Sequence, residues 1–226
     1  DPFSLLEQMR FGRPSDLRRN LSHIQLSGRL ANLVYSMDTT NTDFYAYQFK
    51  PVLTFLESPS NGLLIADEVG LGKTIEAGLI WTELRKRYDS RRLLVVCPAM
   101  LREKWKEELQ DKFGVDATIM NAEELLTELK RSKDEIPDGK AIICSIQGIR
   151  PPTGWQNEKD QVRGHRHNLA VYLDEQSTSD PLVDLLIVDE AHYLRNPESQ
   201  TAKLGLMLRD VSEHIALLSA TPVSLH

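Results

Sequence analysis

Residues 63–76 read LLIADEVGLGKTIE, and this stretch carries the strongest structural signal in the chain. Its first four residues are apolar and predict a buried strand, its middle is a turn with two glycines, and its end begins an apolar-periodic helix. A strand, a glycine loop and a helix in this order are typical of phosphate binding, because backbone N–H groups of the loop and the helix N-terminus both attract phosphate oxygens. The stretch therefore predicts a magnesium nucleoside triphosphate as the ligand.

Two side chains of this stretch have distinct expected roles. Lys73 supplies a mobile positive charge for the phosphates, and Thr74 offers a hydroxyl ligand to Mg²⁺. The expected nucleotide contacts are Gly70, Leu71, Gly72, Lys73, Thr74 and Ile75. The general pattern G-x-x-x-x-G-K-[ST] has glycine where this chain has Asp67, so a chance glycine-rich turn between a strand and a helix is the alternative.

A second motif lies far downstream, where residues 185–192 read LLIVDEAH. We expect a strand over residues 185–189 that ends in two adjacent carboxylates. In phosphate-loop enzymes, one acid at the end of a neighbouring strand holds Mg²⁺, and an acid beside it orients or deprotonates the attacking water. We assign the metal to Asp189 and the water to Glu190, and count both with Lys73 as candidate catalytic residues. The alternative is an acidic helix N-cap.

Three segments together resemble the N-terminal motor lobe of superfamily-two helicase-like ATPases. They are DEVGLGKT at residues 67–74, DEAHYLRN at residues 189–196 and LSATP at residues 218–222. Asp67 and Glu68 before the glycine loop, and residues 194–196 with Ser199 after the DEAH box, bring the resemblance closer to the SWI/SNF branch and its bacterial RapA/HepA-like members. The resemblance implies ATP and Mg²⁺ as cofactors.

The resemblance also implies how adenine is recognised. Residues 44–56, FYAYQFKPVLTFL, are similar to the family's adenine-reading motif, with Gln48 as its glutamine. A glutamine amide can donate to and accept from the adenine edge at once. The alternative is an exposed helical glutamine. The aromatic stacking partner stays open among Phe44, Tyr45 and Tyr47.

Ser219 and Thr221 resemble the motif that links the ATP site to lobe movement. Their hydroxyls are expected to hydrogen-bond the DEAH carboxylates or His192. A plain turn after a last strand at residues 215–219 is the alternative. These three side chains are the candidates for coupling.

Nucleic-acid contacts are expected at the ends of two strands. The resemblance assigns one to the junction CPAMLREKW, residues 97–105, with Arg102 and Lys104 as donors, and the other to Ser145 with Gln147. A helix N-cap is the alternative for Ser145.

Three further side chains are expected in the core. Trp105 keeps the helical spacing of Leu101 and Leu109, which favours burial over base stacking. Cys97 and Cys144 end predicted buried strands, where free cysteine behaves as a small hydrophobe.

The composition is that of an ordinary soluble globular protein, with 226 residues, 41% hydrophobic and 27% charged. The formal net charge of −6 means that any nucleic-acid contact is a local basic patch. No apolar run has the length of a membrane span, and no signal segment opens the chain, so we expect no membrane partner and a cytoplasmic setting, which would be nucleoid-associated in a bacterial protein.

Alternating strands and helices predict an α/β fold, a three-layer RecA-like parallel sheet with helices on both faces, as in P-loop NTPases. We divide the chain into an N-terminal helical extension, residues 1–43, and an ATP-binding lobe, residues 44–226. Residues 151–181 read as an insert of unknown use, with a helix near residues 162–173. The start at Asp1 without methionine suggests an excised fragment, whose second lobe would be elsewhere in the parent chain.

The resemblance implies a DNA-dependent ATP hydrolase that moves along double-stranded DNA and remodels or displaces bound proteins. Its expected partners are ATP, duplex DNA, the C-terminal lobe of its parent chain and a protein cargo. The isolated fragment is expected to hydrolyse ATP poorly, because arginines of the second lobe complete the site. The alternatives are a strand-separating helicase on DNA or RNA, and a nucleotide-gated scaffold without enzymatic activity.

Overall fold

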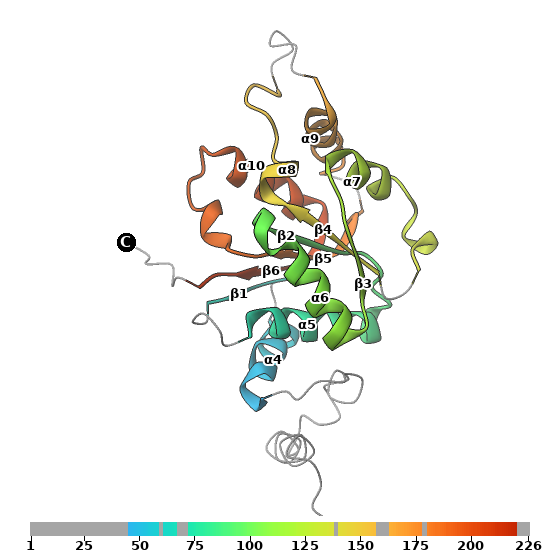
Figure 1. The fold of residues 1–226 in the computed structure, drawn as a ribbon, viewed down its shortest axis with the longest axis vertical. Coiled ribbons are helices and arrows are strands. Elements are labelled where there is room, and N and C mark those ends of the chain that lie inside the picture. The colour runs from blue at the N-terminus through green and yellow to red at the C-terminus, as the bar shows by residue number, and fades with distance from the viewer. Residues whose placement is uncertain are drawn as a thin grey trace, which may run out of the picture.

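The computed structural model describes residues 45–58, 61–66, 72–137, 140–156, 163–177 and 180–220. In this part of the chain a parallel six-stranded sheet has the order β1-β6-β5-β2-β4-β3 (Figure 1). Its strands are β1 (Gly62–Ile65), β2 (Leu93–Cys97), β3 (Asp116–Ile119), β4 (Lys140–Ser145), β5 (Val183–Val188) and β6 (Ser212–Leu218). The predicted parallel sheet is confirmed.

Helices lie on both faces of this sheet (Figure 1). On one side they are α4 (Lys50–Glu57), α5 (Lys73–Tyr88) and α6 (Arg102–Phe113). On the other they are α7 (Ala122–Leu129), α8 (Ile146–Ile149), α9 (His165–Glu175) and α10 (Gln200–Asp210). Short 3₁₀ turns are η1 (Ala46–Phe49), η2 (Ala99–Leu101), η3 (Lys133–Glu135) and η5 (Ala191–Leu194).

The central strand β2 explains why both faces are covered. All five of its residues are buried, and successive side chains of a strand point to opposite faces. Leu93, Val95 and Cys97 pack with the helices of the first face, while Leu94 and Val96 pack with those of the second. A strand buried on both faces reads as a continuous apolar run, which is why its sequence LLVVC predicted it.

The two cysteines lie in the core, as predicted. Cys97 belongs to the apolar cluster on one face of the sheet and Cys144 to the cluster on the other. Burial raises the pKa of both thiols to about 12, so neither is a ready nucleophile at neutral pH.

A local sequence signal marks the start of α7, whereas two strand starts are less clearly marked. Asn121 Oδ1 accepts from the backbone N–H of Glu124 at 3.1 Å, and Glu124 Oε2 accepts from the backbone N–H of Asn121 at 2.8 Å, so a capping box opens α7. The strands predicted at 185–189 and 215–219 instead begin earlier, at Val183 and Ser212, because Asp184 interrupts the apolar run of β5 and the first three residues of β6 are polar.

The insert region contains α9. This helix begins at His165, three residues after the predicted start, and ends at Glu175, two residues after the predicted end. The predicted extension over residues 1–43 lies outside the described residues. Among the helices that the structure describes, none has the length and apolar character required to cross a membrane.

Candidate active site

Strand register brings the DEAH box and Ser219 to one edge of the sheet. In register, Ile65 of β1 pairs with Leu218 of β6, and Leu217 with Val188 of β5. Because the strands are parallel, their carboxyl ends lie at the same edge, and the DEAH box and Ser219 follow directly. Ligands of open α/β sheets bind outside these ends.

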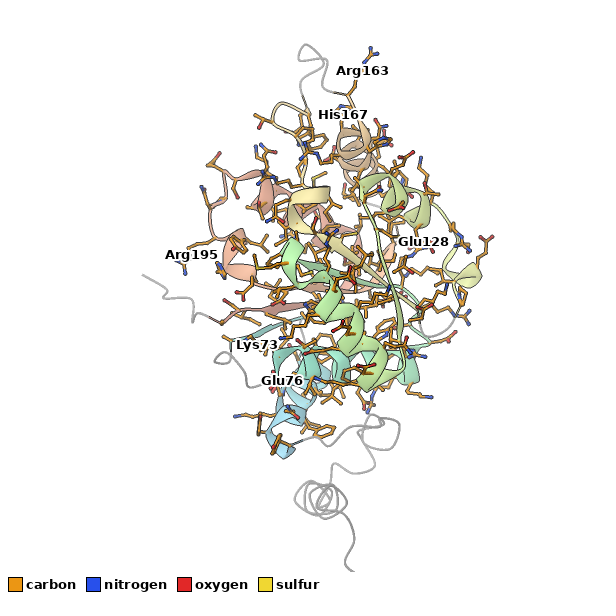
Figure 2. The ribbon with its side chains drawn as sticks, in the orientation of Figure 1. Lys73, Glu76, Glu128, Arg163, His167 and Arg195 are labelled. Atoms are coloured by element: carbon orange, nitrogen blue, oxygen red, sulfur yellow. The ribbon has the colours of Figure 1, made fainter. Side chains whose placement is uncertain are left out.

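The start of α5 provides the phosphate-binding end of the site. Gly72 precedes the helix with φ 92° and ψ 35°, a left-handed conformation suited to glycine. Its carbonyl accepts from the backbone N–H groups of Ile75 and Glu76 at 2.8 and 3.1 Å. Lys73 and Thr74, both partly exposed, begin the 16-residue helix, whose N-terminus attracts anions (Figure 2). Gly70 and Leu71 lie outside the described residues.

Gln48 lies beside this helix start. Its side chain is 3% exposed, so the alternative of an exposed helical glutamine is wrong. Its Oε1 accepts from the backbone N–H of Tyr45 at 2.9 Å, and a Cβ added to Gly72 would stand 2.6 Å from its Nε2. The expected adenine-reading residue therefore contacts the end of the phosphate loop.

Two of the three aromatic candidates for base stacking lie side by side. The rings of Tyr45 and Tyr47 stack with centroids 5.6 Å apart and planes inclined by 18°. Both side chains are 47% exposed, which leaves aromatic surface available. Phe44 lies outside the described residues.

Asp189 is held from three directions at the end of β5. Its backbone N–H donates to Val96 of β2 at 2.9 Å. Its Oδ1 accepts from the backbone N–H of Glu190 at 2.8 Å, and its Oδ2 accepts from Nε1 of Trp105 at 2.9 Å. Each carboxylate oxygen has a second lone pair, so both can still bind a further ligand.

Glu190 has an unusual backbone for a residue with a side chain. It adopts φ 52° and ψ 48°, and Asp89 is the only other non-glycine residue with positive φ in the described part of the chain. This left-handed conformation costs about 1–2 kcal/mol for an L-residue. Such outliers cluster at functional sites, where the surrounding structure maintains them.

The Glu190 side chain lies with the histidine of the DEAH box. Its Oε2 is 3.0 Å from Nδ1 of His192, an ion-pair distance when the ring is protonated. Although Glu190 occupies the N-cap position of η5, its side chain makes no capping hydrogen bond. The acid therefore has the position of a helix N-cap, as the alternative expected, but its side chain does not cap the turn.

Ser219 joins the ends of two strands. It is 1% exposed, and its backbone N–H donates to the carbonyl of Ile65 at 3.0 Å. Since β6 lies between β1 and β5, Ser219 sits between the end of β1 and the DEAH box along the sheet edge. Thr221 lies outside the described residues, and the predicted bonds from these hydroxyls remain predictions.

The donor chemistry of the site fits Mg²⁺. Thr74 offers a hydroxyl and Asp189 a carboxylate, both oxygen donors of the kind this hard cation prefers. Mg²⁺ is usually held by one or two protein oxygens together with phosphate oxygens and waters. The residues present therefore suit a metal that arrives with a triphosphate.

The predicted nucleic-acid residues share this edge. Cys97 at the end of β2 is in register with Ser145 at the end of β4, so the two expected contacts are neighbours. Ser145 Oγ accepts from the backbone N–H of Gly148 at 3.0 Å, so the N-cap alternative describes its role in the fold. Gln147 is exposed beside it.

The other pair opens α6. Arg102 Nε donates to the carbonyl of Ala99 at 3.1 Å, and Lys104, with a side chain 65% exposed, has its Nζ 3.9 Å from Glu108 Oε1. Such an exposed ion pair is weak, and Lys104 can therefore exchange it for a phosphate at low cost.

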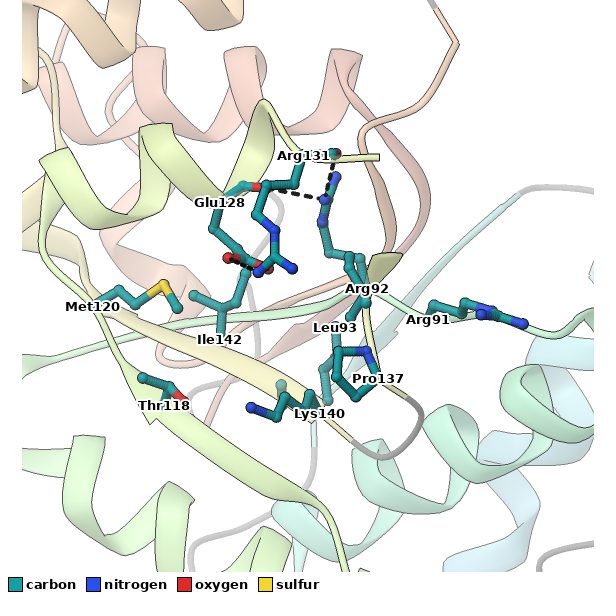
Figure 3. A pocket seen from close by; sticks show the side chains of 12 residues that line it. Arg91, Arg92, Leu93, Thr118, Met120, Glu128, Arg131, Pro137, Lys140 and Ile142 are labelled. Atoms are coloured by element: carbon teal, nitrogen blue, oxygen red, sulfur yellow. Dashed lines mark hydrogen bonds and ion pairs between the residues drawn. The ribbon is translucent and has the colours of Figure 1, made fainter. Parts of the chain in front are cut away.

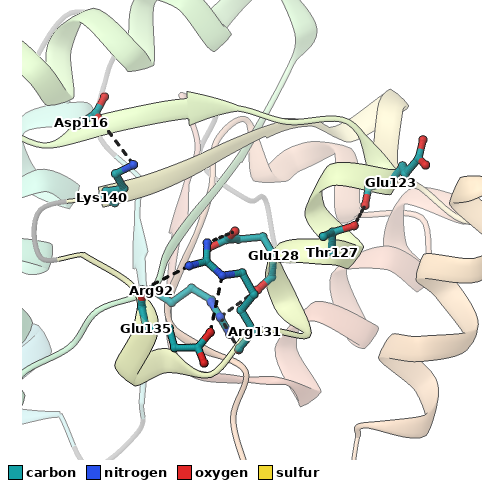
Figure 4. Close-up of polar contacts among 8 residues, drawn as sticks. All are labelled: Arg92, Asp116, Glu123, Thr127, Glu128, Arg131, Glu135 and Lys140. Carbon is teal, nitrogen blue, oxygen red and sulfur yellow. Dashed lines mark hydrogen bonds and ion pairs between the residues drawn. The ribbon is translucent and has the colours of Figure 1, made fainter.

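A pocket of about 220 Å³ lies at the opposite edge, near the amino ends of β2 and β4 (Figure 3). Its cations are Arg91, Arg92, Arg131 and Lys140. The buried Arg92 guanidinium donates to the carbonyls of Glu128 and Arg131 at 3.0 and 2.9 Å, and Arg131 pairs with the Glu128 carboxylate at 3.0 Å (Figure 4). Burial lowers the pKa of the Arg92 guanidinium. These charges serve the fold, so the pocket is a poor candidate for the nucleotide.

Sequence patterns missed two features of the site. The spacing of Trp105 predicted its burial, which is confirmed at 2% exposure, but gave no sign that its N–H reaches Asp189. The left-handed backbone of Glu190 was also missed, because the usual signal for positive φ is glycine or asparagine. Both features depend on contacts between segments that are distant in the sequence.

Comparison with known proteins gives one consistent result. The model of the SNF2-related domain family matches residues 27–225. The RNA polymerase-associated protein RapA of Yersinia enterocolitica and that of Yersinia pseudotuberculosis are each 31% identical over 166 residues, 72% of this chain. The chain spans only 15% of the length of these curated relatives.

Two solved structures of the Sulfolobus solfataricus SWI2/SNF2 ATPase core share the fold. The one in complex with dsDNA is 18% identical and the other 21% identical, and both give a TM-score of 0.55 over 82% of this chain. The match covers 33% and 32% of those chains. At this identity the likeness supports the RecA-like fold and nothing finer.

Proposed function

The chain belongs to the SNF2-related family, and from that premise we propose that it is the ATP-binding lobe of a DNA-dependent ATPase. The proposed ATPase moves along double-stranded DNA and remodels or displaces bound proteins. One observation carries the proposal: the two DEAH carboxylates directly follow β5, and α5 begins with Lys73 near the same edge of the sheet (Figure 2). A site that only bound nucleotide would have no need of an acid to orient water.

Each residue then has a defined task. Lys73 would neutralise the phosphates, Thr74 and Asp189 would hold the metal, and Glu190 would orient the attacking water. Bound Mg²⁺ would supply charge neutralisation at the phosphate oxygens. His192, with Nδ1 3.0 Å from Glu190 Oε2, would hold that carboxylate as an ion pair when its ring is protonated.

The choice of ATP rests on Gln48. Its burial against Gly72 places an amide with both a donor and an acceptor next to the phosphate loop. The stacked rings of Tyr45 and Tyr47 offer an aromatic surface nearby, since the backbone N–H of Tyr45 donates to Oε1 of Gln48. A purine with an exocyclic amine matches such a site.

Duplex DNA and a protein cargo are proposed from the relatives. One Sulfolobus structure is described as a complex with dsDNA, and the Yersinia relatives are named as RNA polymerase-associated. A second lobe of the parent chain would complete the ATP site, so the lobe alone would turn over slowly. Work on chromosomal DNA would place the protein in the cytoplasm at the nucleoid.

The test is steady-state ATP hydrolysis by the full-length parent protein, with duplex DNA, single-stranded DNA and RNA added in turn at one fixed salt concentration. Stimulation by duplex DNA alone supports the translocase. Stimulation by single strands or RNA favours a strand-separating helicase. Absence of hydrolysis under every condition would leave a nucleotide-gated scaffold as the better account.

A further inference from the structure

Trp105 makes an unusual contact for a core residue. It lies on α6, is 2% exposed, and donates its indole N–H to Oδ2 of Asp189 at 2.9 Å. The two residues are 84 positions apart in the sequence. The bond therefore joins α6 to the end of β5 through a single side chain.

This bond completes the fixation of the Asp189 carboxylate. Oδ1 already accepts the backbone N–H of Glu190 at 2.8 Å, so each oxygen has one N–H donor and the plane of the carboxylate is set. Hydrogen bonds to an ionised acceptor are about twice as strong as neutral ones. Carboxylates that ligate metals are commonly held by such outer partners, and losing one typically costs about 10- to 100-fold in metal affinity or activity.

From this geometry, and resting on the proposed function, we propose that Trp105 is a positioning residue that orients Asp189 toward the magnesium of bound nucleotide. Trp105 touches neither nucleotide nor metal in this role and acts only through the carboxylate. Its place on the helix that begins with Arg102 and contains Lys104 ties the orientation of the metal ligand to the helix expected to contact nucleic acid.

Trp81 offers a matched control within the same core. It is 0% exposed and belongs to the same apolar cluster as Trp105. Among the described residues, however, its Nε1 has no hydrogen-bond partner. Trp81→Phe therefore removes the same indole volume from the same core and disturbs no carboxylate.

The experiment measures binding of a fluorescent, non-hydrolysable ATP analogue to the full-length parent protein by anisotropy, as Mg²⁺ is titrated. Trp105→Phe is expected to raise the Mg²⁺ concentration at half-saturation by about 10- to 100-fold. Analogue binding without Mg²⁺ should not change. Trp81→Phe should leave the Mg²⁺ dependence unaltered, although both variants lower the thermal unfolding midpoint.

A second step asks whether Trp105 acts through Asp189. In an Asp189→Ala background, adding Trp105→Phe should change the Mg²⁺ half-saturation by less than about 2-fold, because the partner is already gone. An undiminished effect would overturn the proposal, as would equal shifts in Trp105→Phe and Trp81→Phe. If the wild-type protein shows no Mg²⁺-dependent analogue binding, the proposed function itself fails, which is a different outcome.

Discussion

The side-chain amide of Gln48 lies directly against Gly72, such that a Cβ at Gly72 would stand 2.6 Å from Nε2 of Gln48. Real Cβ atoms do not approach other atoms this closely. Gly72 also has φ 92°, where residues with a Cβ are strained. The backbone conformation thus favours glycine at this position, and any Cβ there would force the Gln48 amide to shift.

Gly72→Ala is expected to weaken ATP binding by more than about 10-fold, because it distorts the loop end and displaces the Gln48 amide together. The backbone strain alone costs about 1–2 kcal/mol. Fluorescence titration with the ATP analogue measures the loss. Gly114→Ala is the control, since Gly114 has φ 63° but no atom within 4 Å of an added Cβ. It should lower stability and leave nucleotide affinity intact, and equal losses of affinity in both variants would contradict the role given to Gln48.

Glu190→Gln should separate binding from chemistry. The amide keeps the shape of the side chain but cannot accept a proton, so kcat should fall by about 10²- to 10⁴-fold with ATP affinity nearly unchanged. Lys73→Ala should instead weaken triphosphate affinity. Steady-state kinetics of the full-length protein with duplex DNA measure both. The exposed Glu198 gives a control in Glu198→Gln, and normal turnover by Glu190→Gln would refute its assignment to the water.

Glu190→Gly should trade activity for stability. Glycine accepts φ 52° without the penalty that a Cβ brings, so the free energy of unfolding should rise by about 1 kcal/mol while hydrolysis is lost. Asp89→Gly, at the same φ, should give a similar gain with no loss of hydrolysis. Urea unfolding of this chain gives the first quantity. A destabilised Glu190→Gly would mean that the strain at Glu190 is offset by its own side-chain contacts.

The architecture was predictable from the sequence because its signals are local. The run LLVVC marks a strand buried on both faces, and Asn121 with Glu124 marks a helix start through residues three positions apart. The motifs also put Asp189 directly after a strand and Lys73 with Thr74 at a helix start, and the structure has them at these places.

What escaped prediction depends on segments that meet only in the folded chain. The bond from Trp105 to Asp189 needs the packing of α6 against the end of β5. The burial of Gln48 needs η1 to lie against Gly72. Asp184 is a third case. An acidic residue near the start of a strand is typical of a loop, and the sequence gives no sign that Lys133, 51 positions away, donates to its carboxylate.

Asp184 makes the stability of the fold depend on pH. It is 5% exposed and accepts from Lys133 Nζ at 2.6 Å and from the backbone N–H groups of Arg91 and Arg92, both at 2.7 Å. Burial raises the pKa of Asp184, but these hydrogen bonds to its charged form outweigh burial, and the pKa lies below its usual value. The carboxylate therefore stabilises the fold above the unfolded pKa of about 3.9, and this stabilisation is lost as the pH falls through the lower, folded pKa.

Asp184→Asn is expected to lower the free energy of unfolding by about 2–4 kcal/mol at pH 7, because charge-assisted bonds at a buried site are lost. The difference between wild type and variant should shrink steadily below about pH 4, as the wild-type carboxyl also becomes neutral. Urea unfolding from pH 7 to pH 2.5 measures it. Lys133→Met removes one of the three donors and should give a smaller loss with the same pH trend. If the difference in the free energy of unfolding between wild type and Asp184→Asn stayed constant with pH, the charge of Asp184 would play no part. The destabilisation would then come from poor packing of the amide.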